Sequence, residues 1–364
     1  MRPCLHNADM SDVALFQPLR LRDIVIPNRI GVSPMCQYSA TDGFANDWHF
    51  AHLATRAVGG AGLVMVEATA VTPEGRITPG CLGIWSDEHA KPLAHIASFL
   101  KNHGSVPGIQ IAHAGRKASA QLPWDGGRAL APDHGAWQTV APSPLPFDEG
   151  WHTPHELTVA EITKLTQSFA DAARRALQAG FEVIEIHGAH GYLLNEFLSP
   201  LTNQRTDPYG GSFENRTRFL REVIAAVRTE WPERLPLFLR ISSSDWVEGG
   251  WTIDDSVELA KMVKPLGIDL IDCSSGGAVA YAKMQIGPGY QVHFADAVRN
   301  RGGIPTAAVG MITEAAQAQS IVATGKADLI LIAREFLRNP YWPIHAARTL
   351  GVPPRVPNQY LRAL

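Results

Sequence analysis

The chain has few cysteines, no excess of either charge and no long apolar run. Its 364 residues include 4 cysteines, 32 basic and 35 acidic residues, and the formal net charge is −3. No charge of one sign is therefore available to attract nucleic acid or an anionic membrane. No stretch reaches the roughly 18 consecutive apolar residues of a membrane-spanning helix, and Asp9 and Asp12 fall where a secretion signal needs an apolar run. We expect a cytoplasmic protein that binds neither nucleic acid nor membranes.

The cysteines also argue against two classes of site. Cys4, Cys36, Cys81 and Cys273 are far apart in the sequence and form no Cys-x-x-Cys spacing. Neither a disulfide framework nor a zinc or iron–sulfur site is predicted from such a pattern. This cysteine usage fits a reducing compartment.

Short apolar runs alternate with amphipathic helical segments, for example residues 158–180 and 212–232, each with a Thr or Ser placed as N-cap. The alternation is typical of an α/β protein with a parallel sheet. Eight runs without a change of composition predict a single (β/α)8 TIM barrel over residues 15–350, after a flexible lead-in at 1–14 and before a tail at 351–364. The runs occupy residues 29–35, 62–68, 106–113, 181–187, 235–241, 268–274, 304–310 and 327–333. A stretch rich in Pro and Gly, residues 116–157, predicts an excursion after the third strand.

Polar residues follow the predicted strands, at the end where TIM barrels place their active sites. Alternation of side chains along a strand directs Gln110, Glu185, His187 and Arg240 into the barrel. Together they suit an anionic, planar ligand that forms hydrogen bonds. The strand-end residues are Ser33, Pro34, Met35, Cys36 and Tyr38 after the first strand, Gln110 and His113 after the third, His187, His190 and Tyr192 after the fourth, Arg240 after the fifth, and Gly310 and Arg334 after the last two.

Three other interpretations stay open on these residues alone. Any one of them can be structural: Arg240 would then pair with Glu185, and Cys36 would be a small core residue. His187 and His190 can be read as two metal ligands of a barrel hydrolase, although Arg240 and Arg334 would disfavour a dication nearby. A non-catalytic binding protein would require a blocked barrel mouth.

Several longer motifs resemble the Old Yellow Enzyme family of FMN-dependent ene-reductases, specifically its YqjM-like or xenobiotic reductase branch. The likeness runs from about Phe16 to Arg362. The dienoyl-CoA reductase type shares the barrel but needs cluster-binding cysteines, which this sequence does not provide. The motifs are SPMCQYSA (33–40), VEATAVTPEGRIT (66–78), QIAHAGRKAS (110–119), EIHGAHGYLLNEFLSPLTNQRTDPYGGSFENR (185–216), DCSSG (272–276), AVGMIT (308–313) and ARE (333–335).

The resemblance implies a non-covalently bound FMN. Gln110 would hold the pyrimidine edge of the flavin and Arg240 would lie near N1. Ala333 stands where the branch commonly has Gly. The flavin ring would be lined by Ser33, Pro34, Met35, Cys36 and Ala68, and the phosphate would be held by Gly310, Ala333 and Arg334.

The resemblance also implies a reaction. NADPH would reduce the flavin at N5, and the reduced flavin would pass hydride to the C=C bond of an α,β-unsaturated carbonyl compound. His187 and His190 would bind the carbonyl oxygen, and Tyr192 is the candidate proton donor.

Five further residues receive roles by the same resemblance. Cys36 would tune the flavin potential, and Tyr38 would reach the substrate. Lys117 and Trp342 are placed only at the rim of the site. The branch implies a homodimer or homotetramer, in which Arg362 from the tail of one subunit enters the active site of its neighbour.

Overall fold

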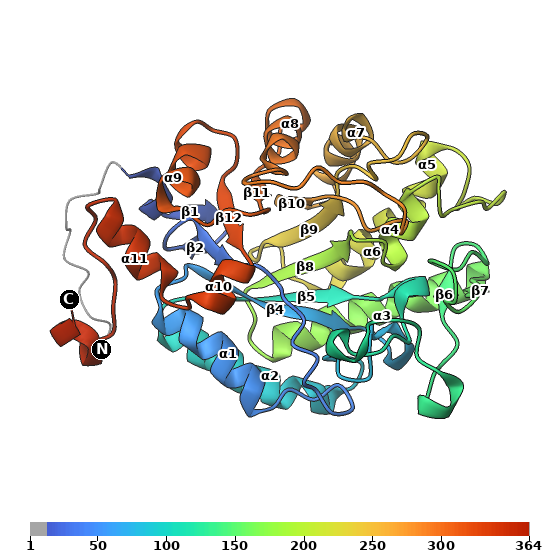
Figure 1. Cartoon of the computed structure of the whole chain (residues 1–364), viewed down its shortest axis with the longest axis horizontal. Helices are drawn as coiled ribbons and strands as arrows, with labels where there is room; N and C mark the ends of the chain where they lie inside the picture. The colour runs from blue at the N-terminus through green and yellow to red at the C-terminus, as the bar shows by residue number, and fades with distance from the viewer. Residues whose placement is uncertain (1–12, 364) are drawn as a thin grey trace.

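The computed structural model describes residues 13–363; residues 1–12, most of the predicted lead-in, and residue 364 lie outside the described residues. Eight parallel strands close a barrel in the order β10-β11-β12-β3-β4-β5-β8-β9, with helices outside it (Figure 1). All eight predicted strands are confirmed. They are β3 (Ile30–Val32), β4 (Leu63–Ala70), β5 (Val106–Ala112), β8 (Val183–Gly188), β9 (Leu237–Ser242), β10 (Leu270–Ser274), β11 (Thr306–Ala308) and β12 (Leu329–Ile332).

The helices confirm the predicted alternation. The predicted helix at 212–232 is present as two, which meet at Thr217, where the Thr217 hydroxyl donates to the Glu214 carbonyl (3.0 Å). Thr158 caps the helix predicted at 158–180 and accepts a hydrogen bond from the Glu161 N–H. The helices are α1 (Asp47–Val58), α2 (Asp87–Asn102), α3 (Val159–Gln178), α4 (Leu193–Leu198), α5 (Phe213–Arg216), α6 (Arg218–Glu230), α7 (Ile253–Val263), α8 (Val292–Gly302), α9 (Ala315–Ala323), α10 (Arg334–Arg338) and α11 (Trp342–Thr349).

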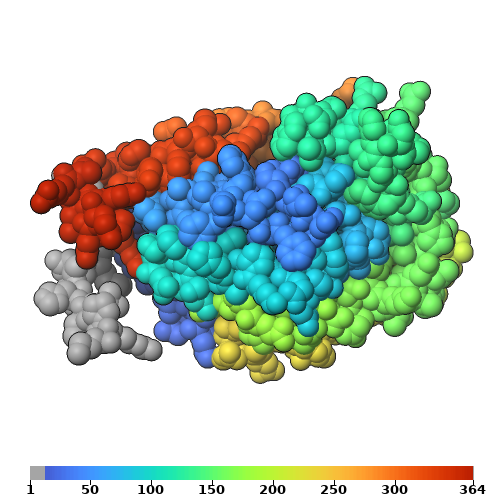
Figure 2. Space-filling view, turned by 90° about the horizontal axis from the view of Figure 1, so that it is seen from below, coloured from blue at the N-terminus to red at the C-terminus, as the bar shows by residue number. Residues whose placement is uncertain are grey.

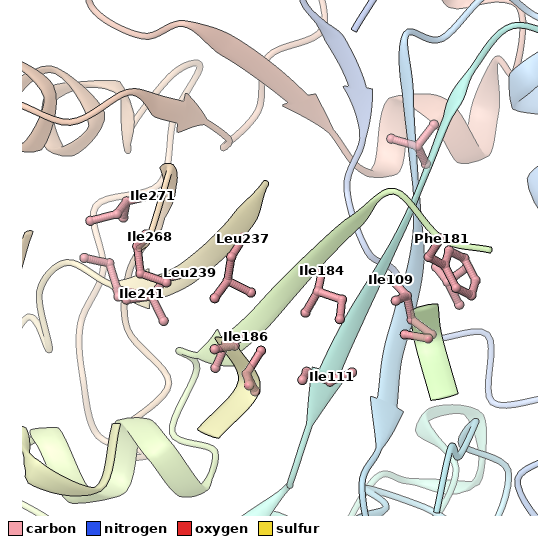
Figure 3. Packing of buried hydrophobic residues seen from close by; sticks show 14 of the residues in the cluster. Ile109, Ile111, Phe181, Ile184, Ile186, Leu237, Leu239, Ile241, Ile268 and Ile271 are labelled. Carbon is pink, nitrogen blue, oxygen red and sulfur yellow. The ribbon is translucent and has the colours of Figure 1, made fainter. Parts of the chain in front are cut away.

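The side chains of the strands divide between two hydrophobic clusters. One cluster fills the space between strands and helices and includes Ile109, Ile184 and Leu239, which point away from the barrel interior (Figure 3). The other cluster, which includes Met65 and Phe238, fills the interior of the barrel. The predicted direction of alternate side chains is therefore confirmed on β5, β8 and β9.

A hairpin that the sequence analysis did not predict closes the N-terminal end of the barrel. Its strands are β1 (Leu19–Leu21) and β2 (Ile24–Ile26), which pair antiparallel. Leu19, Leu21 and Ile26 belong to the interior cluster, so they cover the barrel end opposite the predicted site. The strands are only three residues long, too short for a clear alternation in the sequence.

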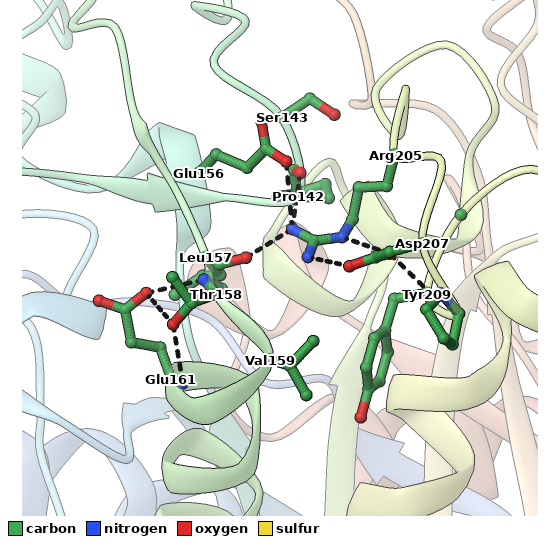
Figure 4. Close-up of polar contacts among 12 residues, drawn as sticks. Pro142, Ser143, Glu156, Leu157, Thr158, Val159, Glu161, Arg205, Asp207 and Tyr209 are labelled. Atoms are coloured by element: carbon green, nitrogen blue, oxygen red, sulfur yellow. Dashed lines mark hydrogen bonds and ion pairs between the residues drawn. The ribbon is translucent and has the colours of Figure 1, made fainter.

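The predicted excursion after the third strand is present and carries three short 3-10 helices, the first being η3 (Gly115–Lys117). Figure 2 shows it in green as a ridge on the surface. It also contains a parallel strand pair, β6 (Val140–Ala141) and β7 (His155–Glu156). Arg205 ties this pair to the barrel by donating to the carbonyls of Pro142 (3.1 Å) and Leu157 (2.6 Å), while Asp207 binds the same guanidinium (Figure 4).

The C-terminal tail lies against its own barrel. Arg355 donates to the Gly104 carbonyl (3.2 Å), beside the C-terminal ends of α1 and α2. Helices of a (β/α)8 barrel end opposite the carboxyl ends of the strands, so this contact is remote from the chain's own strand ends. None of the helices within residues 13–363 combines the length and apolar character that crossing a bilayer requires.

Candidate active site

Arg240 lies at the centre of the barrel mouth. It is in register with His187 on β8 and with Asp272 on β10. Its Nε lies 2.9 Å from Oδ2 of Asp272, so the ion pair of Arg240 is with Asp272. The structural interpretation had paired Arg240 with Glu185 instead. The sequence analysis missed Asp272, although it stands between Ile271 and Cys273, which both belong to the outer cluster.

A second polar pair lies beside the first. Gln110 donates from Nε2 to Oε1 of Glu185 (2.7 Å), and Oε2 of Glu185 has no hydrogen-bond partner within the described part of the chain. Burial, reinforced by the negative charge of Asp272, raises the pKa of Glu185 to about 8, and Arg240 opposes this shift. Gln110 is thereby fixed at the mouth, with its carbonyl oxygen and one N–H left for a ligand.

His187, His190 and Tyr192 form a cluster of three rings. The His187 ring centroid lies 5.1 Å from that of His190 and 5.0 Å from that of Tyr192, with interplanar angles of 86° and 89°. Burial, together with the positive charge of Arg240, lowers the pKa of both imidazoles well below the usual value. Burial raises the pKa of Tyr192 well above its usual value. At neutral pH the cluster therefore holds two neutral imidazoles and a protonated phenol.

Hydrogen bonds orient the two imidazoles. Nδ1 of His187 lies 3.2 Å from the Ala189 N–H and accepts from it, so the proton of the neutral ring is on Nε2. Nε2 of His190 lies 2.7 Å from Oγ of Ser274. Ser274 and its neighbour Gln291, whose Nε2 donates to the Val309 carbonyl (3.0 Å), were not among the predicted site residues. The motif DCSSG contains Ser274, but no pattern in the sequence connects it with Gln291.

The loop after β3 forms the opposite side of the mouth. The hydrogen bond with the Cys81 thiol, together with burial, raises the pKa of Cys36 well above its usual range, so Cys36 stays a thiol. Tyr38 has a positive φ of 52° and packs edge-on against Trp124 from the excursion, at 6.1 Å between ring centroids. Ala68 follows a bulge in β4 and lines a small cavity shared with Cys81 and Tyr192.

A cavity of about 240 Å³ leads from Arg240 to the ends of β11 and β12. Gly310 has a φ of 125°, and a Cβ there would lie 3.0 Å from the side chains of Tyr290 and Gln291. The predicted phosphate residues Gly310, Ala333 and Arg334 all line this cavity. Arg338, one helical turn beyond Arg334, also lines it and was missed by the sequence analysis, although it stands only four residues after Arg334.

The remaining predicted residues do not line this cavity. Ser33 is buried, and its N–H donates to the Ile332 carbonyl (2.9 Å) between β3 and β12; Pro34 and Met35 follow it and are half-buried. His113 is enclosed, and burial lowers its pKa to about 4. Trp342 is a core residue rather than a rim residue, because it is buried, packs on Phe336 and donates to the Thr313 carbonyl (2.7 Å).

A barrel mouth that offers hydrogen-bond donors and positive charge suits an enzyme with an organic, anionic cofactor. The pattern of the NADH:flavin oxidoreductase / NADH oxidase family matches residues 14–351. An NADPH dehydrogenase of Geobacillus sp. (strain WCH70) is 52% identical over 353 residues, which are 96% of this chain and 98% of that protein. An NADPH dehydrogenase of Bacillus subtilis (strain 168) is 48% identical over 350 residues, 96% of this chain and 98% of that protein.

Comparison with solved structures supports the same relationship. The solved structure of morphinone reductase superposes with a TM-score of 0.76 at 26% identity, covering 96% of this chain and 93% of that one. The chain belongs to the NADH:flavin oxidoreductase family, the Old Yellow Enzyme family. It is an enzyme, an NAD(P)H:flavin oxidoreductase. This assignment replaces the metal-hydrolase interpretation, and residues 13–363 contain no group of three or more His, Cys, Asp or Glu placed to hold a metal ion.

Proposed function

We propose that the enzyme binds FMN non-covalently and uses NADPH to reduce the C=C bond of α,β-unsaturated carbonyl compounds. One observation carries the proposal: two neutral imidazoles, His187 and His190, face a protonated Tyr192 beside the cation Arg240. Hydrogen-bond donors at a fixed position stabilise a developing enolate oxygen. A phenol that stays protonated suits transfer of a proton to carbon.

The residues present fit FMN. Gln110 offers an amide to the pyrimidine edge, and Arg240 offers positive charge near N1. The cavity beyond Arg240 has two guanidinium groups, Arg334 and Arg338, at the end where Gly310 removes side-chain bulk. Arg334 makes no ion pair with a carboxylate of residues 13–363, which leaves it available for phosphate. When bound, FMN supplies a two-electron carrier between NADPH and the alkene.

The protein's own groups then have separate tasks. The Nε2–H of His187 donates to the carbonyl oxygen. His190 is the second donor through its Nδ1–H, with the Ser274 hydroxyl donating to its Nε2. Tyr192 donates its phenolic proton to the α-carbon. Ser33, Pro34, Met35 and Ala68 form the wall against the flavin, and Cys36 contributes an uncharged thiol there. Tyr38, next to the excursion, borders the substrate.

The test has two parts. The purified protein should show the visible absorption of an oxidised flavin, released as FMN on denaturation. In anaerobic stopped-flow mixing, NADPH should bleach that absorption and 2-cyclohexen-1-one should restore it. His187→Ala and His190→Ala should each slow the restoration by about 10²- to 10³-fold, as loss of an oxyanion donor does. A colourless protein, or reoxidation by the enone at the wild-type rate in both variants, contradicts the proposal.

A further inference from the structure

The backbone of His190 has a strained conformation. Its φ is 63°, in the left-handed region that residues other than glycine rarely adopt, and Gly191 follows with a φ of 70°. At Gly191 a Cβ would lie 1.9 Å from the carbonyl oxygen of Gly277, so the loops after β8 and β10 meet backbone to backbone. Other contacts must hold His190 in this conformation.

Lys117 supplies one of these contacts. It lies in η3, directly after β5, and its Nζ donates to the carbonyl of His190 (2.9 Å) and to that of Gly277 (3.2 Å). The same ammonium lies 4.4 Å from the ring centroid of Phe147 and 5.2 Å from that of Tyr192. One side chain thus binds both loops and borders the proton donor.

Ser242 holds the other side of His190. Its Oγ accepts from the His190 N–H (2.8 Å) and donates to the Gly276 carbonyl (2.7 Å). The two peptide groups that flank the His190 side chain are therefore both bound to groups that also bind the loop at 276–277. The two fixed peptides set the direction of the Cα–Cβ bond of His190, and the contact between its Nε2 and Oγ of Ser274 (2.7 Å) then orients the ring.

The charge of Lys117 also acts on the cluster. Within residues 13–363 it forms no ion pair with a carboxylate. Burial lowers the pKa of its ammonium to about 8, so it stays mostly protonated at neutral pH. Its positive charge contributes to the lowered pKa of both His187 and His190. It therefore favours neutral imidazoles and adds positive potential where negative charge would develop on a substrate oxygen.

We propose that Lys117 is a positioning residue of the active site, whose ammonium holds His190 in its left-handed conformation and directs the imidazole toward the substrate oxygen. The start of the excursion then has the role of placing the Lys117 ammonium at the barrel mouth. The inference rests on the proposed function, because it assigns the binding of the substrate oxygen to His190.

The experiment compares Lys117→Met, which keeps the length of the stem, with Lys117→Arg, which keeps the charge and the donors. Lys164→Met, on the exposed face of α3, is the matched control. Lys117→Met should retain FMN but be reoxidised by 2-cyclohexen-1-one about 10- to 100-fold more slowly, the effect of a small misplacement of a catalytic group. Its affinity for 4-hydroxybenzaldehyde, followed by the flavin spectrum, should fall by a similar factor. Lys117→Arg should recover part of both losses, and the control should match wild type.

The outcomes separate the two proposals. If the wild-type protein lacks FMN or is not reoxidised by the enone, the proposed function fails. The positioning role is overturned by a different result. In that case the wild type reacts as proposed, and Lys117→Met, with full FMN, keeps the wild-type rate of reoxidation and the wild-type affinity for 4-hydroxybenzaldehyde. Should Lys117→Met not fold, Lys117→Leu, which likewise has neither an N–H donor nor a charge, replaces it in the same comparison, and wild-type values there overturn the role equally.

Discussion

Arg240 and Asp272 lie side by side on β9 and β10, with Nε of the guanidinium 2.9 Å from Oδ2 of the carboxylate. Neither carboxylate oxygen has a hydrogen-bond partner within residues 13–363, so Arg240 alone offsets the buried negative charge. Burial raises the pKa of Asp272 to about 6, and Arg240 opposes the rise. The cation that we assign to the flavin is therefore also required by the barrel itself.

Arg240→Met should lower the free energy of unfolding by about 3–5 kcal/mol, because it leaves Asp272 buried without its partner. The double variant Arg240→Met, Asp272→Leu should recover much of that loss. Chemical denaturation of the flavin-free proteins measures both. The exposed pair Arg301–Asp254 is the control, and Arg301→Met should cost under about 1 kcal/mol. If the double variant is as unstable as Arg240→Met, Arg240 does not stabilise the barrel by offsetting the buried charge of Asp272.

Arg334→Ala should weaken retention of FMN, because it removes a guanidinium suited to bidentate contact with phosphate. The measurement is flavin per subunit after exhaustive dialysis. Arg348→Ala, an exposed arginine on α11, should keep its flavin. Equal flavin content in the two variants would show that the phosphate lies elsewhere.

Tyr192→Phe should slow reoxidation by 2-cyclohexen-1-one by up to about 100-fold, the contribution typical of a general acid. Reduction of the flavin by NADPH should stay near the wild-type rate, since it requires no protein acid. Tyr38→Phe removes a hydroxyl from the substrate border and should change KM more than kcat. Stopped-flow traces in which Tyr192→Phe reoxidises normally would assign the proton to another source.

Glu196 predicts a pH dependence of stability. Burial raises its pKa to about 8 in the folded protein, against about 4.3 in an unfolded chain. Between these values the folded state holds the extra proton, so this group lowers stability as pH rises, by up to about 1.4 kcal/mol per pH unit. Glu196→Gln should therefore gain stability relative to wild type between pH 5 and pH 7, as measured by chemical denaturation.

The control for Glu196 is Asp207→Asn. The hydrogen bond from Arg205 holds the pKa of Asp207 below its usual value, so its contribution is lost only as pH falls below about 4. The stability difference between Asp207→Asn and wild type should be the same at pH 5 and pH 7. A constant difference for Glu196→Gln as well would show that Glu196 is ionised in the folded protein at both pH values.

The tail predicts an active site shared between subunits. Arg362 is exposed in η6 (Asn358–Ala363), next to the contact between Tyr341 and Tyr360. We expect a homodimer or homotetramer in which Arg362 enters a neighbouring mouth. Deleting residues 358–364 should raise KM for enones without changing FMN content. An unaltered KM, or a monomer in sedimentation, would show that the tail has no such role.

The sequence alone determined the barrel fold and which side chains of several strands point into its mouth. Apolar runs of strand length are local features, and alternation within a run specifies which side chains face inward. That rule was enough to direct Gln110, Glu185, His187 and Arg240 to the interior. It also implied Asp272, which was overlooked because it stands in a short run read only for its hydrophobic residues.

Only the tertiary structure decided the partners. Cys36 and Cys81 are 45 residues apart in numbering, and Lys117 and His190 are separated by 73, so no local pattern connects them. Such contacts depend on how the closed barrel brings its loops together. The strained φ of His190 is likewise hidden in the sequence, because a left-handed residue other than glycine is held by distant groups, here Lys117 and Ser242, rather than by its own preference.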